Sequence, residues 1–117
     1  MKTILIVEDT EINIDLITQL LEDEYSLLFA RDGEQGLKMA LQNNPDLILM
    51  DISLPGIDGY EVTRKIRETK KNMPIIALSA HAMSGHKQTA IDAGCTDYLT
   101  KSIDDKLLFT ILNMYLS

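Results

Sequence analysis

Three short, unbroken runs of aliphatic residues divide this chain of 117 residues and limit the folds that it can adopt. The runs cover residues 4–7, 47–50 and 75–78, and a polar residue follows each of them. Their length matches a β-strand, and continuous rather than alternating hydrophobicity indicates burial on both faces, as in a parallel sheet. Residues 25–30 and 97–100 are weaker strand candidates, which brings the expected number of strands to five.

Longer amphipathic segments separate these runs and predict helices. The first helix is expected over residues 11–22, where Ile17, Leu20 and Leu21 share one face. The other four segments carry their hydrophobic faces at Leu37, Ala40 and Leu41; at Val62 and Ile66; at Ala90 and Ile91; and at Leu107, Leu108, Ile111, Leu112 and Tyr115. Five strands, each followed by a helix, predict a doubly wound α/β fold of the (βα)5 type, with helices on both faces of one parallel sheet.

Several residues mark where these helices begin and end. Residues 43–45, Asn-Asn-Pro, are expected to stop the second helix, and Gly94 is placed to cap the fourth. Ser102 and Asp105 predict a start resembling a capping box for the fifth. A basic run ends the third helix and is interpreted as a solvated end that complements the helix dipole. It consists of Arg64, Lys65, Arg67, Lys70 and Lys71.

Length and composition indicate a single globular domain over residues 1–117. A chain of this size can bury its own core, and 45% hydrophobic with 25% charged residues excludes a disordered or collagen-like chain. Cys95 is the sole cysteine, so an intramolecular disulfide is impossible and a reducing cytoplasm is the expected location. The apolar run near the N-terminus is too short for a signal peptide or a membrane span, so no membrane contact is expected.

The net charge of −7 disfavours nucleic-acid binding, which usually requires a basic surface. The charge is unevenly distributed along the chain. Residues 1–62 contain 3 basic and 13 acidic side chains, whereas residues 63–117 contain 8 basic and 5 acidic ones. The carboxylates are therefore concentrated in the first half of the chain, where they either have a function or are tolerated.

Polar residues close the predicted strands. Glu8 and Asp9 follow the first run, Asp51 the second and Ser79 the third, while Lys101 follows the weak fifth strand. In open parallel sheets, ligands bind beyond the carboxyl ends of the strands. Three carboxylates, one hydroxyl and one ammonium group are therefore expected to meet at one edge of the sheet.

This set of groups suits phosphoryl transfer. Converging carboxylates need a compensating cation, and oxygen ligands without His or Cys favour Mg²⁺, with Mn²⁺ also possible. An aspartate carboxylate can attack phosphorus and form an aspartyl phosphate. Positioning and neutralisation of the phosphoryl oxygens then supply most of the catalysis, from the cation on one side and Lys101 and Ser79 on the others.

Five motifs in order and spacing resemble the receiver domain of two-component response regulators, a family that includes the bacterial chemotaxis response regulator. They are residues 6–9 (Ile-Val-Glu-Asp), 46–51 (Asp-Leu-Ile-Leu-Met-Asp), 54–59 (Leu-Pro-Gly-Ile-Asp-Gly), 77–80 (Ala-Leu-Ser-Ala) and 97–101 (Asp-Tyr-Leu-Thr-Lys). The resemblance covers essentially the whole chain. It implies a flavodoxin-like sheet with strand order 2-1-3-4-5.

The resemblance also implies a metal site and a phosphoacceptor. Asp51 matches the phosphoacceptor and a metal ligand. Glu8 and Asp9 match the acidic pair that holds Mg²⁺, with Asp9 the more direct ligand. The backbone carbonyl of Ser53 matches the remaining protein ligand.

Three further residues match the switch machinery of the family. Ser79 matches the switch hydroxyl, Lys101 the lysine that pairs with the phosphate, and Tyr98 the aromatic switch that turns inward. The family usually has proline after this lysine, with a cis peptide bond, whereas this chain has Ser102. A cis bond before a residue other than proline costs about 3–4 kcal/mol, so both the isomer of this bond and the reach of Lys101 stay open.

As a receiver, the chain is expected to be a signalling switch rather than an enzyme with its own substrate. It would accept a phosphoryl group from a sensor histidine kinase or a phosphotransfer protein and then contact a downstream protein, as a monomer or weak dimer. The chain ends just after the fifth predicted helix, so protein contact is the expected output. A receiver excised from a hybrid kinase or a longer regulator is an alternative.

Three other functions remain to be distinguished. A Mg²⁺-dependent phosphatase with an aspartate nucleophile would usually have an acid two residues after Asp51, where this chain has Ser53. A flavin or nucleotide binder would need a phosphate loop after the first strand, where Glu8 and Asp9 would repel phosphate. A receiver-like protein that binds partners without phosphorylation would not need Lys101 together with these acids.

Overall fold

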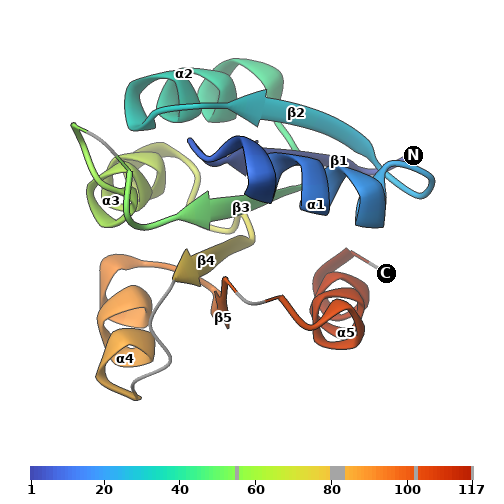
Figure 1. The fold of residues 1–117 in the computed structure, drawn as a ribbon. Coiled ribbons are helices and arrows are strands. Elements are labelled where there is room, and N and C mark those ends of the chain that lie inside the picture. The colour runs from blue at the N-terminus through green and yellow to red at the C-terminus, as the bar shows by residue number, and fades with distance from the viewer. Residues whose placement is uncertain (55, 80–83, 102, 117) are drawn as a thin grey trace.

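The computed structural model describes residues 1–54, 56–79, 84–101 and 103–116. Five parallel strands form one sheet in the order β2-β1-β3-β4-β5 (Figure 1). The strands are β1 Thr3–Val7, β2 Ser26–Ala30, β3 Leu47–Asp51, β4 Ile75–Ser79 and β5 Asp97–Thr100. The helices are α1 Glu11–Leu21, α2 Gly33–Asn43, α3 Gly59–Thr69, α4 Ser84–Ala93 and α5 Asp105–Leu116. The predicted (βα)5 fold and strand order are confirmed.

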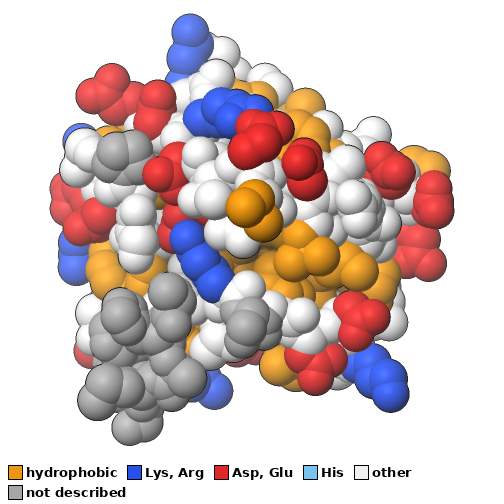
Figure 2. All heavy atoms as spheres, in the orientation of Figure 1, with side chains coloured by type: hydrophobic (Ala, Val, Ile, Leu, Met, Phe, Trp, Pro, Cys, Tyr) orange, Lys and Arg blue, Asp and Glu red, His pale blue; other side chains and the backbone are white. Residues whose placement is uncertain are grey.

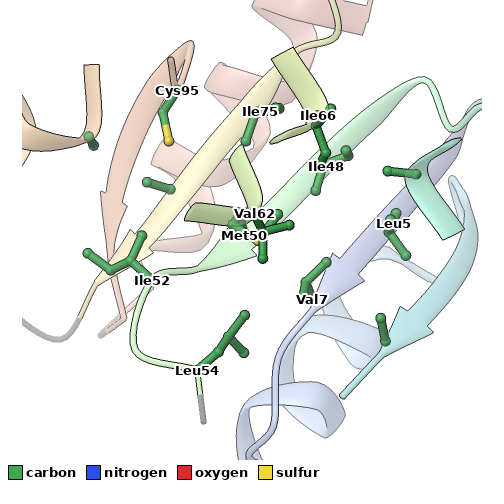
Figure 3. Packing of buried hydrophobic residues seen from close by; sticks show 14 residues of the cluster. Leu5, Val7, Ile48, Met50, Ile52, Leu54, Val62, Ile66, Ile75 and Cys95 are labelled. Carbon is green, nitrogen blue, oxygen red and sulfur yellow. The ribbon is translucent and has the colours of Figure 1, made fainter. Parts of the chain in front are cut away.

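Helices cover the sheet on both faces, which explains the unbroken hydrophobic runs. Alternate residues of β1 belong to two separate cores: Leu5 and Val7 pack with α2, α3 and α4, whereas Ile4 and Ile6 pack with α1 and α5. Figure 3 shows the first core, where Val62 of α3 approaches the residues of the sheet. Because every residue of such a strand faces a helix layer, no position can be polar before the strand ends.

Helix ends follow local capping rules, with one correction to the sequence prediction. The left-handed Asn44 ends α2 and Gly94, at φ 110°, follows α4, as predicted. The start of α5 differs, because Asp104 is its cap: its Oδ1 accepts hydrogen bonds from the backbone N–H of Lys106 at 2.9 Å and of Leu107 at 3.2 Å. Asp105 is instead the first residue of the helix, and Ser102 lies outside the described residues.

Arg67 also differs from its interpretation as part of a solvated basic run. Its guanidinium is half-buried and donates hydrogen bonds to the carbonyls of Gly94 at 2.8 Å and Lys70 at 2.9 Å, and to the hydroxyl of Thr96 at 3.1 Å. Thr96 Oγ1 in turn accepts from the N–H of Ile75 at 3.0 Å. Arg67 therefore ties α3 to the loop between α4 and β5.

Hydrophobic side chains reach the surface between α1 and α5 (Figure 2). Ile12 in the first turn of α1 is 77% exposed, and Leu16 and Leu107 are also exposed. Ile12 is the third residue after Asp9, which follows the end of β1 by two positions. None of the helices in the described part of the chain has the length and hydrophobicity needed to cross a lipid bilayer.

Candidate functional site

Parallel pairing brings the strand-end residues to one edge of the sheet. The last registered pair between β1 and β3 is Val7 with Met50, so Glu8 and Asp51 come next on neighbouring strands. The backbone N–H of Glu8 donates to the carbonyl of Ala30 at 2.9 Å, and the N–H of Lys101 donates to the carbonyl of Ser79 at 2.6 Å. These hydrogen bonds extend the sheet just past the strands, so the backbone is still paired at Glu8 and at Lys101.

The three predicted carboxylates converge. Glu8, Asp9 and Asp51 each offer a carboxylate oxygen, and these oxygens all lie within 4.8 Å of one another. Glu8 and Asp51 are 0% exposed, whereas Asp9 is exposed. The cluster is therefore buried on one side and open to solvent at Asp9.

Lys101 reaches the same cluster. Its Nζ lies 2.9 Å from Asp51 Oδ2 and 3.4 Å from Glu8 Oε1, and its side chain is 19% exposed. Lys101 follows β5, which β4 separates from β3, so the side chain spans a whole strand to reach Asp51. The isomer of the bond to Ser102 lies outside the described residues.

The surroundings of Asp51 and Lys101 raise the pKa of both groups. Burial raises the pKa of Asp51, and the charge of Glu8 adds to the rise, against the lowering effects of the Ser53 N–H and Lys101. Partial burial lowers the pKa of Lys101, but the hydrogen bond and charge of Asp51, with the charge of Glu8, raise it overall. The ammonium ion is thus firmly protonated beside carboxylates that need compensation.

Glu8 is held through one of its two oxygens. Oε1 accepts hydrogen bonds from the Thr10 N–H at 3.3 Å, from Asn13 Nδ2 at 3.1 Å and from Lys101 Nζ at 3.4 Å. Oε2 is buried and has no hydrogen-bond partner. No motif in the sequence identified Asn13, although its position in α1, five residues after Glu8, was available as a signal.

The residues fit a divalent cation. Three carboxylates and one ammonium group leave two negative charges in a largely buried cluster. A buried carboxylate oxygen without a partner is costly, and Glu8 Oε2 is such an atom. Oxygen ligands alone favour Mg²⁺ or Mn²⁺, as the sequence predicted.

Ser53 and Ser79 lie beside this cluster, and Tyr98 lies on β5, the strand that precedes Lys101. The Ser53 N–H donates to Asp51 Oδ1 at 2.9 Å, which fixes the acid on the side away from Lys101. Ser79 is buried and ends β4, between Asp51 and Lys101 in the sheet. Tyr98 is half-buried in β5, in register with Ala77, and packs against the core beneath α2, α3 and α4.

Gly59 allows α3 to start against the end of β3. An added Cβ would lie 2.6 Å from the Cα of Ile52 and would also collide with the carbonyl oxygen of Asp51. The side chain of Asp58 caps the helix by accepting from the N–H of Glu61 at 3.0 Å. The backbone that carries Asp51 is therefore clamped between the sheet and α3.

Comparison with known proteins places this geometry in a family. Residues 4–113 match the family described as the response regulator receiver domain. The chain is similar to the response regulator PleD of Caulobacter vibrioides, with 38% identity over 109 residues, or 91% of this chain and 24% of PleD. It thus spans about a quarter of that relative. It is also similar to the polar-differentiation response regulator DivK of Brucella ovis, with 36% identity over 118 residues, or 98% of this chain and 96% of DivK.

A solved structure has the same fold. The receiver domain of the sensor histidine kinase PA1611 from Pseudomonas aeruginosa has a TM-score of 0.90 and 38% identity, covering 97% of this chain and 96% of that domain. That structure holds a magnesium ion in its active-site cleft. With the family match over residues 4–113, the strand order and the acidic cluster at the sheet edge, this chain belongs to the response regulator receiver domains of two-component signalling.

Proposed function

We propose that Asp51 accepts a phosphoryl group from a phosphohistidine on a sensor kinase or phosphotransfer protein, with Mg²⁺ bound. The observation that carries this proposal is the buried Asp51 carboxylate, which lies between an acidic pair and the Lys101 ammonium group. A nucleophile, a cation site and a fixed positive charge thus meet at one strand end. These are the parts that phosphoryl transfer to a carboxylate requires.

In the proposed step, a carboxylate oxygen of Asp51 forms a bond to phosphorus while the bond from phosphorus to the donor imidazole nitrogen breaks. That nitrogen keeps the electron pair of the broken bond. The Ser53 N–H, 2.9 Å from Asp51 Oδ1, orients the acid, and Lys101 neutralises charge on the phosphoryl oxygens. Glu8, Asp9, Asp51 and the carbonyl of Ser53 would hold Mg²⁺, which supplies further neutralisation when bound.

The same modification would drive the switch. Ser79 would donate a hydrogen bond to the phosphoryl group, and Tyr98 would turn inward, changing the surface of α4, β5 and α5. Moving such an equilibrium from 1:99 to 99:1 needs about 5.5 kcal/mol. Charge-assisted hydrogen bonds of about 1.5–3 kcal/mol each, from Lys101 and Ser79, are of the right size.

The proposed partners are proteins. The exposed Ile12, three residues after Asp9, and the apolar surface between α1 and α5 support docking of the phosphoryl donor on this side of the molecule. We propose a single domain over residues 1–117, in the cytoplasm, as a monomer or weak dimer, whose chemistry is limited to its own phosphorylation and dephosphorylation. Its output would be contact with a downstream protein, either as a separate chain, as with DivK, or within a longer protein, as with PleD.

Incubation with Mg²⁺ and acetyl phosphate, followed by intact mass spectrometry, tests the proposal. We expect one labile phosphoryl adduct in the wild type and none in Asp51→Asn or with a chelator. Asp58→Asn is a matched control, because Asp58 is exposed near the site and Asn also caps helices, so it should label normally. An unlabelled wild type that binds Mg²⁺ would contradict the proposal, and rapid turnover of an unrelated phosphoester would favour a phosphatase.

A further inference from the structure

Asn13 is the one side chain of α1 that makes a hydrogen bond to the acidic cluster among the described residues. Its Nδ2 donates to Glu8 Oε1 at 3.1 Å. Asn13 is half-buried and lies in the first turn of α1, where it contacts the residue that follows β1. Asn13 is therefore an uncharged side chain that donates a hydrogen bond to Glu8, one of the proposed metal ligands.

The contacts of Glu8 are asymmetric. Three donors, two of them from the start of α1, hold Oε1, whereas Oε2 is buried without a partner. Glutamate has one more side-chain torsion than aspartate, and its terminal torsion is broad, so its carboxylate orientation needs to be fixed by contacts. The donors on Oε1 leave Oε2 as the oxygen free to bind a cation.

We infer that Asn13 is a positioning residue that raises the affinity of the site for Mg²⁺ by holding Glu8 in this orientation. The inference rests on the proposed cation site. Lys101 cannot replace Asn13, because it is shared with Asp51 at the shorter distance of 2.9 Å. Residues that orient metal ligands typically change metal affinity by about 10- to 100-fold, and the partial exposure of Asn13 places it near the lower end.

The variant Asn13→Ala is suited to the test because it should fold. Alanine has a higher helix propensity than asparagine, so α1 is not weakened by the change. Gln19→Ala is the matched control: it removes an exposed amide from the same helix, far from Glu8 in sequence. Any general effect of losing a polar side chain from α1 appears in both variants.

Isothermal titration of each full-length variant with MgCl₂ gives the dissociation constants. We expect Asn13→Ala to raise the Kd about tenfold, while Gln19→Ala stays within about twofold of the wild type. Loss of one of the three donors on Glu8 Oε1 should lower the midpoint of thermal unfolding without Mg²⁺ modestly in Asn13→Ala, and the increase of this midpoint on adding Mg²⁺ should shrink. A lower midpoint without the cation, with an unchanged Kd, would mean a purely structural role and overturn the inference.

A double-mutant cycle shows whether Asn13 acts through Glu8. In a Glu8→Gln background, titrated to saturation at higher Mg²⁺, Asn13→Ala should change the Kd by less than about twofold. An equal loss in both backgrounds would overturn the inference. If the wild type and Asn13→Ala bind Mg²⁺ equally well, the role of Asn13 is overturned but the proposed cation site stands. If the wild type does not bind Mg²⁺, the proposed cation site itself is overturned.

Discussion

Lys101 Nζ lies 2.9 Å from Asp51 Oδ2, and this ion pair joins the ends of two strands that are not neighbours in the sheet. Asp51 ends β3 and Lys101 follows β5, with β4 between them. The charge of the buried carboxylate is therefore compensated from two strands away. A phosphoryl group placed on Asp51 would lie within reach of the same ammonium ion.

Removing the ammonium group should destabilise the cation-free protein. Lys101→Met leaves Asp51 and Glu8 buried with less compensation, so the free energy of unfolding should fall by about 2 kcal/mol at pH 7. Urea denaturation in the presence of a chelator measures this change in the free energy of unfolding. Lys106→Met, on the exposed start of α5, should change stability by less than about 0.5 kcal/mol, and an equal effect of both substitutions would contradict the role of Lys101.

Gly59→Ala should damage the site through the backbone. Its Cβ would collide with the carbonyl oxygen of Asp51 and lie 2.6 Å from the Cα of Ile52, so α3 must move and about 3 kcal/mol should be lost. Gly56→Ala is the comparison: nothing lies within 4 Å of its Cβ, and only its φ of +73° is strained, which costs about 1–2 kcal/mol. Thermal unfolding of both variants checks this order, and a reversed order would contradict it.

Arg67 should matter for stability although it lies in a basic run. Arg67→Ala removes a half-buried guanidinium that bridges Gly94, Lys70 and Thr96, and should cost about 2–3 kcal/mol. Arg64→Ala removes only an exposed ion pair with Glu61 at 3.3 Å and should cost less than about 0.5 kcal/mol. Equal unfolding midpoints in urea for the two variants would refute this distinction.

The hydrogen bond from Tyr115 to Asp97 predicts a pH dependence at high pH. Tyr115 Oη donates to Asp97 Oδ2 at 3.0 Å, and burial, followed by this hydrogen bond and the charge of Asp97, raises the pKa of the phenol. The folded state therefore keeps a proton that the unfolded state loses near pH 10, and the stabilisation is full below about pH 10 and lost as the pH rises through the raised pKa.

Comparison of wild type with Tyr115→Phe measures this contribution. The difference in unfolding free energy should be about 1 kcal/mol at pH 7 and should shrink above about pH 10. Tyr25→Phe is the control: burial raises the pKa of Tyr25, but its hydroxyl donates no hydrogen bond to any residue that the structure describes, so little stability should be lost at pH 7. A difference for Tyr115→Phe that stays constant with pH would exclude the hydrogen bond as its source.

Local sequence patterns were enough to identify the strands and helices and the polar residues at the strand ends. Unbroken runs such as residues 47–50 can only be buried on both faces, so they identify parallel strands and predict where each one ends. Asp51 and Lys101 could then be assigned to one edge of the sheet, because parallel strands end at the same edge. The order of polar residues along the chain was enough for this, because strand length and hydrophobicity are local properties.

The contacts between side chains of different elements could not be predicted from these local patterns. Lys101 reaches across β4 to Asp51, and Asn13 holds one oxygen of Glu8. The half-buried Arg67 bridges α3 and the loop before β5. All three are contacts between separate elements. Such contacts depend on the register of the strands and on how the helices pack on the sheet. Local hydrophobic patterns describe which face of an element is buried, but they do not describe which residue of another element will meet it there.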